Sequence, residues 1–281
     1  MDDKDFKNGI EAFYVGTKVS RDFANDIMIP RLKGLLKPSK KEAIIINIYY
    51  RMFLWIDSLA TLNDGKHFQV AAAGARVLFE LLLDLKLIVE DKINDSVEKY
   101  YAFTEIEKAR VSRNTLDYVN TNPDKGVNIQ SIEKYLSGAG GKDRVDALVI
   151  KYWGKDKNGK PKIVRHWSGV NTAMRARNAK GMYYEFYIRT YPILSWNLHS
   201  AAGAGFLYMN EKGFNAVFGT AHRLTHQMFI EATFLVGKEF NFDKAEPKFS
   251  GWIKKLKLVP GLELVKKYRP DFDVEEVLNA I

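Results

Sequence analysis

Apolar residues recur at three- and four-residue spacing along nearly the whole chain of 281 residues. That spacing is the period of an α-helix with one buried face. The clearest helix start is at Pro38-Ser39, where Glu42 follows Ser39 by three residues and completes the pattern of a capping box. The segment ends at Asn63-Asp64-Gly65, which is typical of a helix stop. The pattern therefore predicts an all-α protein.

Turn-forming residues divide the chain into several helices, and Pro30 is expected to break the first of them because proline lacks a backbone N–H. The predicted helices span about residues 19–36, 39–63, 68–91, 95–120, 127–137, 143–152, 170–180, 182–209, 211–238 and 274–280. Residues 153–169 interrupt this pattern, and Asn158-Gly159 is a strong turn signal. We expect one multi-helix bundle over residues 1–245, with a loop or small hairpin near 153–169, and a helical tail over 246–281 packed on it.

Composition excludes several classes of protein. The chain has no cysteine, which excludes a disulfide scaffold, a thiolate metal site and a cysteine nucleophile. Its two longest apolar stretches, 43–60 and 71–89, each contain charged residues, and its first residues are polar and acidic. Charges are costly in the hydrocarbon of a bilayer. We therefore expect a cytoplasmic protein with no membrane partner.

The positive charge is concentrated in two segments. The net charge is +9, yet residues 151–180 contain nine Lys or Arg and one acid, and residues 248–269 contain seven Lys or Arg and one acid. Phosphates bind such segments because Lys and Arg replace condensed counterions. The predicted anion-binding residues are Lys155, Lys157, Lys160, Lys162, Arg165, Arg175 and Arg177.

Two interpretations of the basic loop stay open. Trp153 and Trp167 flank it, and His166 lies within it. Aromatic faces beside cations suit single-stranded nucleic acid, whose bases stack on them. In the alternative, the charges only solvate an exposed loop and the tryptophans anchor its ends in the core.

Four polar side chains form a row on the predicted helix over residues 182–209. Tyr187, Tyr191, Ser195 and His199 recur at intervals of four, which places them along one side of a helix. Pro192 lies within the row and is expected to kink the helix.

Two runs of small residues, 71–75 and 200–205, predict where this row packs. Small side chains let helix backbones approach closely, and glycine inside a helix usually has a packing reason. If the two runs meet in antiparallel helices, Arg76 and Glu80 lie near His199.

Such a cluster has a chemical interpretation and a structural one. Glu80 could orient His199 and raise its basicity while Arg76 holds an anionic group. His199, Glu80, Arg76 and Tyr187 are then the candidate catalytic residues of a metal-independent, RNase-like hydrolase. In the alternative, the Arg–Glu pair and the histidine lock the helices in register and the protein is not an enzyme.

No metal or cofactor is expected. His222 and His226 have the four-residue spacing of some zinc ligands, but Arg223 stands where those sites carry glutamate. The sequence also lacks the glycine-rich phosphate loops and the nucleophile elbow of common nucleotide enzymes and hydrolases.

Three short motifs carry a resemblance to a known family: residues 75–80, Trp167-Ser168-Gly169, and the tyrosine, serine and histidine series that begins at Tyr184. Over about residues 70–210 the chain resembles a family of uncharacterised all-helical prokaryotic proteins. The resemblance implies a helical fold and favours Arg76, Glu80 and His199 as a unit. It implies no activity.

Two hypotheses of function follow. In the first, the protein is intracellular and its polar pocket and basic surface bind or cleave nucleic acid or another phosphate ligand. In the second, it is a non-catalytic interaction subunit that binds a partner chain or a second copy of itself. Exposed aromatic and basic residues such as Trp252, with Lys254, Lys255 and Lys257, would then form the interface.

Overall fold

The computed structural model describes residues 3–62, 67–122, 129–196 and 211–242 of the chain. These parts are helices and loops, and they contain no strand beyond an isolated antiparallel bridge between Lys155 and Pro161. The prediction of an all-α fold is confirmed. No helix in these parts is both long enough and apolar enough to cross a membrane.

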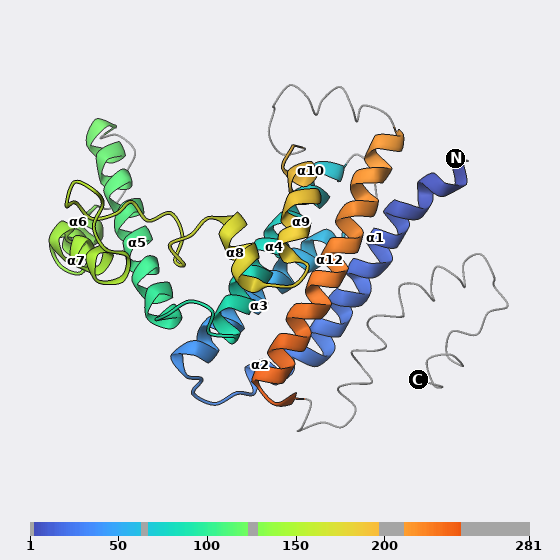
Figure 1. Ribbon diagram of the computed structural model, residues 1–281, viewed down its shortest axis with the longest axis horizontal. Coiled ribbons are helices and arrows are strands. Elements are labelled where there is room, and N and C mark those ends of the chain that lie inside the picture. The colour runs from blue at the N-terminus through green and yellow to red at the C-terminus, as the bar shows by residue number, and fades with distance from the viewer. Residues whose placement is uncertain (1–2, 63–66, 123–128, 197–210, 243–281) are drawn as a thin grey trace. The chain divides into compact units, whose positions relative to one another are not determined.

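The chain divides into two compact units (Figure 1). The first unit contains residues 1–90 and 176–281, and the second unit contains residues 91–175. Neither boundary was predicted from the sequence, and the predicted boundary at residue 245 lies outside the described residues. In chain order the helices are α1 (Asp3–Phe23), the π-helical η1 (Ala24–Met28), α2 (Ile29–Lys33), α3 (Lys40–Leu59), α4 (Phe68–Val89), α5 (Ser96–Thr121), α6 (Gln130–Ser137), α7 (Lys142–Trp153), α8 (Thr172–Ala179), α9 (Tyr183–Arg189), α10 (Tyr191–Trp196) and α12 (Glu211–Glu239).

Local sequence signals place the helix ends. The Glu42 amide donates to Ser39 Oγ at 3.2 Å, and the Ser39 amide donates to Glu42 Oε2 at 2.6 Å, so the predicted capping box starts α3. Pro30 does not end the helix, which continues from residue 3 to residue 33, but the proline directly follows the π-helical η1 and Ile29. Because Pro30 has no N–H, the helix changes register there, and the Ile29 amide bonds to the Ala24 carbonyl five residues back.

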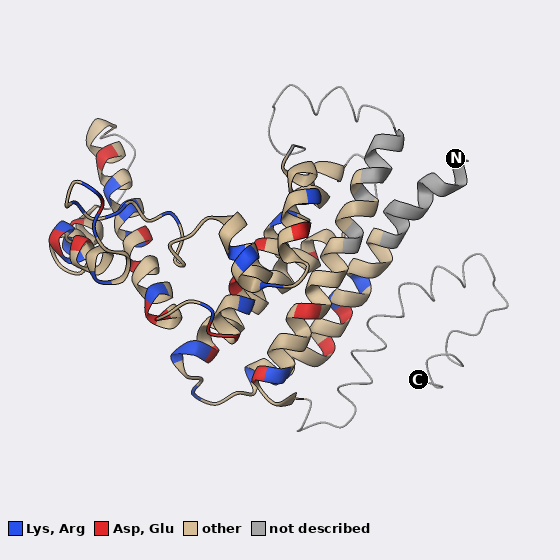
Figure 2. Ribbon diagram, in the orientation of Figure 1, with Lys and Arg blue, Asp and Glu red and all other residues tan. Residues whose placement is uncertain are grey.

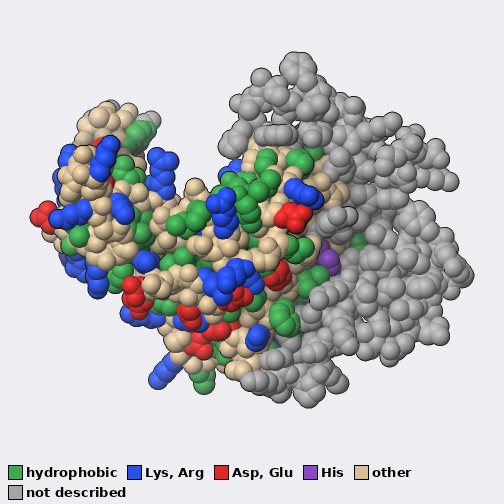
Figure 3. Space-filling view, viewed as in Figure 1, with side chains coloured by type: hydrophobic (Ala, Val, Ile, Leu, Met, Phe, Trp, Pro, Cys, Tyr) green, Lys and Arg blue, Asp and Glu red, His purple; other side chains and the backbone are tan. Residues whose placement is uncertain are grey.

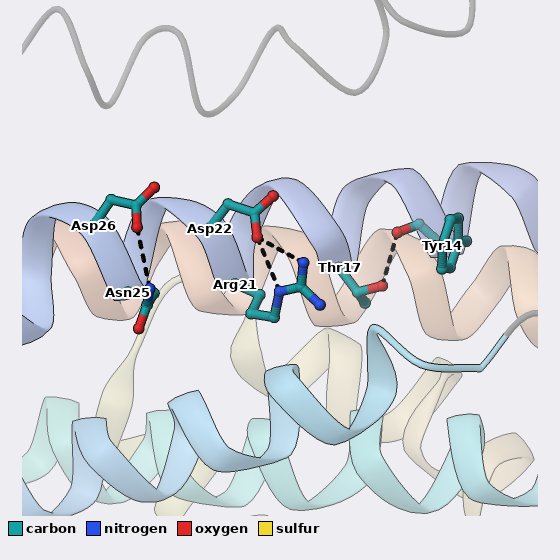
Figure 4. A network of polar contacts seen from close by, with 6 residues as sticks. All are labelled: Tyr14, Thr17, Arg21, Asp22, Asn25 and Asp26. Carbon is teal, nitrogen blue, oxygen red and sulfur yellow. Dashed lines mark hydrogen bonds and ion pairs between the residues drawn. The ribbon is translucent and has the colours of Figure 1, made fainter.

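The polar contacts of α1 are local (Figure 4). Thr17 Oγ1 donates to the Phe13 carbonyl at 2.7 Å and also approaches the Tyr14 carbonyl at 3.1 Å. Arg21 Nη2 lies 2.8 Å from Asp22 Oδ1. The hydrogen bonds that Arg21 donates to Asp22 raise the pKa of Arg21, so its guanidinium stays charged in the ion pair. The charges of Arg21 and Asp22 are therefore paired within this segment of the chain.

Helix α4 forms the core of the first unit. Helices α3, α10 and α12 pack against it, and α1 packs against α12 and α3. Leucine, alanine and phenylalanine side chains on several sides of α4 are fully or almost fully buried, among them Ala72, Ala75, Leu78, Phe79, Leu82, Leu83, Leu85 and Leu87. A helix that is apolar on several sides is stable only when neighbours cover it, and burial of each leucine or phenylalanine side chain contributes about 1.5–3 kcal/mol.

The run of small residues on α4 packs against α3. A Cβ atom placed on Gly74 would lie 2.6 Å from Leu59 Cδ1, so the absence of a side chain lets Leu59 sit against the α4 backbone. The other predicted run, residues 200–205, lies outside the described residues. Packing therefore explains the glycine at position 74, and its contact is Leu59 on α3.

The second unit has a small core of its own. Helix α5 packs against α6 and α7. Four buried side chains from α5 and α7 form the cluster, and three half-buried ones pack against it: Ile106, Ala109, Val145 and Val149, with Tyr135, Trp153 and Val164. Trp153 is the last residue of α7 and Val164 lies in the loop that follows it, so this loop is attached to the core at its start and near its end.

Lys86 is a half-buried charge on α4, with its side chain 15% exposed. Its Nζ lies 2.7 Å from Glu90 Oε1, 3.7 Å from Glu231 Oε1 on α12, and 5.3 Å from the centre of the Tyr183 ring. Burial raises the pKa of Glu231, Lys86 partly opposes this, and the charge of Glu90 raises it further. The ion pair of Lys86 and Glu231 connects α4 to α12, and both side chains are half-buried.

We expect Gly74→Val to lower the free energy of unfolding by about 1–3 kcal/mol, because the new side chain must displace Leu59. Urea unfolding measures the change. In a Leu59→Ala background the added cost of Gly74→Val should shrink, with a coupling of about 0.5–3 kcal/mol. Ala73→Val, at a half-buried position one residue earlier, measures the cost of β-branching alone. Equal costs at 73 and 74, with no coupling to Leu59, would contradict the packing described.

The raised pKa of Glu231 predicts a pH dependence with a defined sign. From the ordinary pKa of 4.5 up to the raised native value, the folded state holds more protons than the unfolded state, so stability falls as pH rises through this window. Glu231→Gln removes that loss. The unfolding free energy of the variant minus that of the wild type should therefore increase with pH across the window, in urea titrations at several pH values. A difference that stays flat across the window counts against the assignment.

Candidate functional site

A three-residue polar cluster joins α4 to the start of α10. Arg76 Nε donates to Glu80 Oε1 at 3.2 Å and to the Tyr191 hydroxyl at 2.7 Å. The Tyr191 hydroxyl in turn donates to the same Glu80 oxygen at 2.6 Å. Arg76 and Glu80 are one helical turn apart on α4, which puts both on one side of the helix. The three groups therefore close a triangle in which each bonds to the other two.

Burial controls the protonation of this cluster. Tyr191 is 9% exposed. Burial, together with the hydrogen bond to Glu80, raises the pKa of Tyr191 to about 12, so its hydroxyl keeps the proton that it donates. Burial alone would lower the pKa of Arg76, but the interactions with Tyr191 and Glu80 outweigh it and raise that pKa. At neutral pH the cluster is a charged Arg–Glu pair bridged by a neutral phenol.

A row of tyrosines extends from the cluster along α9. The rings of Tyr187 and Tyr191 are 5.1 Å apart, and those of Tyr184 and Tyr187 are 6.5 Å apart and nearly parallel. Arg177 lies over the Tyr184 ring at 4.3 Å, and Arg76 lies over the Tyr191 ring at 5.0 Å. Cations stabilise aromatic faces in this position. The tyrosine rings thus make contacts with one another and with two arginines of the same protein.

The predicted helix over residues 182–209 is interrupted within its described part. Helix α9 ends at Arg189, Thr190 follows, and α10 begins at Tyr191. Pro192 is the second residue of α10, so the predicted kink is a break between two helices. Proline clashes with the preceding turn of a helix but fits well in a first turn. The break places Tyr191 at a helix start, where its side chain reaches α4.

The structure brings together part of the predicted catalytic set. Arg76 and Glu80 bond to each other, and Tyr187 contacts the cluster through the ring of Tyr191. His199 lies outside the described residues. The Ser195 hydroxyl is buried and has no hydrogen-bond partner within the described parts. A catalytic role for these residues stays a prediction.

Tyr191 is the member of the cluster that sequence reasoning did not select. It belonged to the four-residue row, yet the predicted pocket contained Tyr187 instead. The signal that could have found it is Pro192, because a helix restarting there puts Tyr191 in the first turn, beside α4.

The loop after α7 folds as a short hairpin, which we call the basic hairpin (residues 154–165). Lys155 and Pro161 form its bridge, and the Asp156 amide donates to the Lys160 carbonyl at 2.7 Å. Gly154 and Gly159 have φ angles of 81° and 76°, which favour glycine. The prediction of a loop or hairpin near 153–169 agrees with these contacts.

Five of the predicted anion-binding residues lie exposed on the basic hairpin: Lys155, Lys157, Lys160, Lys162 and Arg165. The single acid there, Asp156, accepts hydrogen bonds through Oδ1 from the amides of Asn158 at 2.8 Å and Lys160 at 3.0 Å. Its carboxylate therefore shapes the turn from within. Lys and Arg segments follow this loop between α7 and α8 in Figure 2.

Both tryptophans beside the basic hairpin are anchors. Trp167 is 2% exposed and its ring packs 6.0 Å from that of Tyr100. Trp153 Nε1 donates to the Trp167 carbonyl at 3.2 Å, and a Cβ on Gly169 would lie 2.6 Å from the Trp153 ring. Trp167 thus offers no exposed face for a nucleic acid base. The contacts of the two tryptophans agree with the part of the second interpretation that concerns them, the anchoring of the loop ends.

Two of the predicted anion-binding residues are not part of this surface. Arg175 is 3% exposed, and its Nη2 donates to Thr172 Oγ1 at 3.0 Å. A buried guanidinium is not available to a polyanion in solution, so we correct the prediction for Arg175. Arg177 is exposed but belongs to the first unit, where it covers Tyr184.

The histidine pair on α12 has a structural contact. His226 Nδ1 lies 2.9 Å from the hydroxyl of Ser20, which is fully buried on α1. The side chain of His222 lies outside what the structure describes. No group of three or more metal-ligating side chains gathers in the described residues. His226 ties α12 to α1.

The sequence of this all-helical chain matches the model of a known family. The model of a family of unknown function (DUF5677) matches residues 42–216, which is more than half of the chain, so the chain belongs to that family. The match confirms the predicted membership of an uncharacterised family, and the prokaryotic origin stays a prediction. No curated protein and no solved structure matches the chain.

Tyr191→Phe tests what the cluster contributes. We expect the free energy of unfolding to fall by about 1.5–3 kcal/mol, because the substitution removes hydrogen bonds to two charged groups. Thermal or urea unfolding measures it. Tyr187→Phe is the matched control, since the Tyr187 hydroxyl has no hydrogen-bond partner in the described residues, and its effect should stay within about 0.5 kcal/mol. Equal losses for the two variants would show that the bonds of Tyr191 do not matter.

Proposed function

We propose that the protein binds nucleic acid through the phosphates, on the basic hairpin of the second unit. One observation supports this most strongly: five exposed cations stand on a hairpin whose single carboxylate bonds to backbone amides of the turn. Phosphates would therefore meet five exposed cations and one carboxylate, a net charge of +4 (five minus one) on residues 154–165. Figure 3 shows Lys and Arg side chains over the visible face of this unit.

Contacts at the two ends of the hairpin and within it support this proposal over a purely solvated loop. Trp153 and Val164, at its two ends, pack against the core cluster of the second unit. The bridge between Lys155 and Pro161 and the turn at Asp156 fix the segment between them. Cations that are already in place lose less conformational entropy when they contact a phosphate backbone.

The chemistry of the hairpin favours binding without sequence preference. Lysine is a point charge on a flexible stem, and contacts to phosphate position a protein without reading bases. Because Trp167 is buried, base stacking contributes little here. Cleavage is a separate hypothesis that rests on His199, and the second hypothesis, a protein-interaction subunit, remains as the alternative.

The test replaces Lys155, Lys157, Lys160 and Lys162 together by glutamine and follows a labelled single-stranded oligonucleotide by fluorescence anisotropy. We expect the dissociation constant at low salt to rise about tenfold or more. The slope of log affinity against log salt should become shallower by about 3, since each phosphate contact on a single strand contributes about 0.7.

The matched control replaces four exposed lysines elsewhere, Lys33, Lys134, Lys142 and Lys238, by glutamine. It removes the same charge and should leave most of the affinity and slope. If both variants weaken binding alike, the attraction belongs to the net charge of the protein and the hairpin assignment fails. Absence of any salt-dependent binding by the wild type, together with a stable oligomer in solution, would favour the interaction subunit.

A further inference from the structure

The first unit contains a cavity that neither the polar cluster nor the basic hairpin uses. It lies between α9 and α12 and has a volume of about 690 Å³. Small-molecule sites typically measure about 300–1,000 Å³. The cavity is therefore large enough for an organic molecule of the size of a cofactor fragment or metabolite.

The walls combine apolar and hydrogen-bonding groups. Leu224 on α12 and Phe186 on α9 give apolar surface, and Leu224 is 2% exposed, which places it deep in the wall. Thr190 and Thr220 add a hydroxyl from each side. An apolar surface with a few polar groups is typical of sites that enclose a small amphipathic molecule.

Two side-chain contacts connect the walls of the cavity to neighbouring helices. The Phe186 ring packs 5.0 Å from that of Phe79 on α4. Gln227 Nε2 on α12 donates to the sulfur of Met182 at 3.5 Å, and both of these residues line the cavity. These contacts connect α9 to α4 and to α12, so the cavity has a defined width before any ligand binds.

The charges of the lining favour an uncharged ligand. Arg189 Nη1 and Glu185 Oε1 form an ion pair at 3.0 Å, with side chains 77% and 62% exposed. This pair sits on the solvent side and leaves the lining with no net charge. An anionic or cationic ligand would have to compete with one member of the pair, whereas a neutral ligand leaves both bonded.

Gly219 keeps one wall open. Among the described residues, a Cβ atom placed there meets no atom within 4 Å, although Gly219 lies inside α12 and lines the cavity. Glycine inside a helix lowers helix stability relative to alanine, so it commonly has a packing or functional reason. At Gly219 no described atom lies close enough to require a glycine, and the missing side chain leaves free volume in the cavity.

We propose that this cavity binds a neutral, amphipathic small molecule whose apolar body contacts Phe186 and Leu224 and whose polar groups reach Thr190 and Thr220. The site lies in the unit that does not carry the basic hairpin, so this proposal is independent of nucleic acid binding. Substitutions at Gly219 separate binding from folding, because the first added atom, Cβ, meets no described atom within 4 Å.

The experiment titrates the full chain with Nile red, a neutral dye whose fluorescence rises in apolar surroundings. We expect saturable binding at one site. Gly219→Ala, Gly219→Val and Gly219→Leu should weaken it progressively, by tenfold or more for leucine, while the thermal unfolding midpoint of the alanine variant stays equal or rises. Asn47→Leu, on the exposed face of α3, adds the same leucine side chain elsewhere and should leave the affinity unchanged.

Two results would overturn the proposal. Unchanged Nile red affinity in Gly219→Leu, with the variant folded, would show that the dye binds elsewhere. Binding of the anionic dye anilinonaphthalene sulfonate as tightly as Nile red, and equally sensitive to Gly219→Val, would contradict the assignment of a neutral ligand. The alanine variant keeps the test valid if the leucine variant fails to fold.

Discussion

The burial of α4 among α3, α10 and α12 is the constraint on which the first unit depends. Its leucines and Phe79 are buried, and the charged residues among them, such as Arg76 and Lys86, are half-buried. A buried or half-buried charge is costly unless it is paired. Arg76 bonds to Glu80 and Tyr191, and Lys86 lies beside Glu90 and Glu231, which are the partners that this burial requires.

This constraint gives the polar cluster a structural role that does not depend on catalysis. The Tyr191 hydroxyl bridges Arg76 and Glu80 and thereby holds the start of α10 on α4. The same anchoring of α9 and α10 sets one wall of the cavity, since Phe186 packs on Phe79. The core, the cluster and the cavity wall of this unit are therefore linked through one helix. The basic hairpin depends on a different core, formed by α5 and α7 in the second unit.

Features set by a few neighbouring residues could be predicted from the sequence. The capping box of Ser39 and Glu42 and the turn at Asn158-Gly159 were of this kind, because each depends on local backbone hydrogen bonds and dihedral angles. The long helix predicted over residues 182–209 was too long. Pro192 was recognised as a kink, but whether a helix bends or restarts depends on what the next turn packs against, and here Tyr191 packs on α4.

The sequence by itself determined the helical class, the close pairing of Arg76 with Glu80 one turn apart, and the concentration of positive charge between residues 151 and 180. Only the tertiary structure decided which of those charges face water. Arg175 is buried against Thr172 while Arg165 and the hairpin lysines are exposed, although all carry the same charge and lie in one short segment. It also decided that Trp167 is an anchor, that Gly74 receives Leu59, and that Gly219 faces a cavity. The physical reason is that helix formation and charge are properties of neighbours along the chain, whereas burial depends on which distant segments cover a residue.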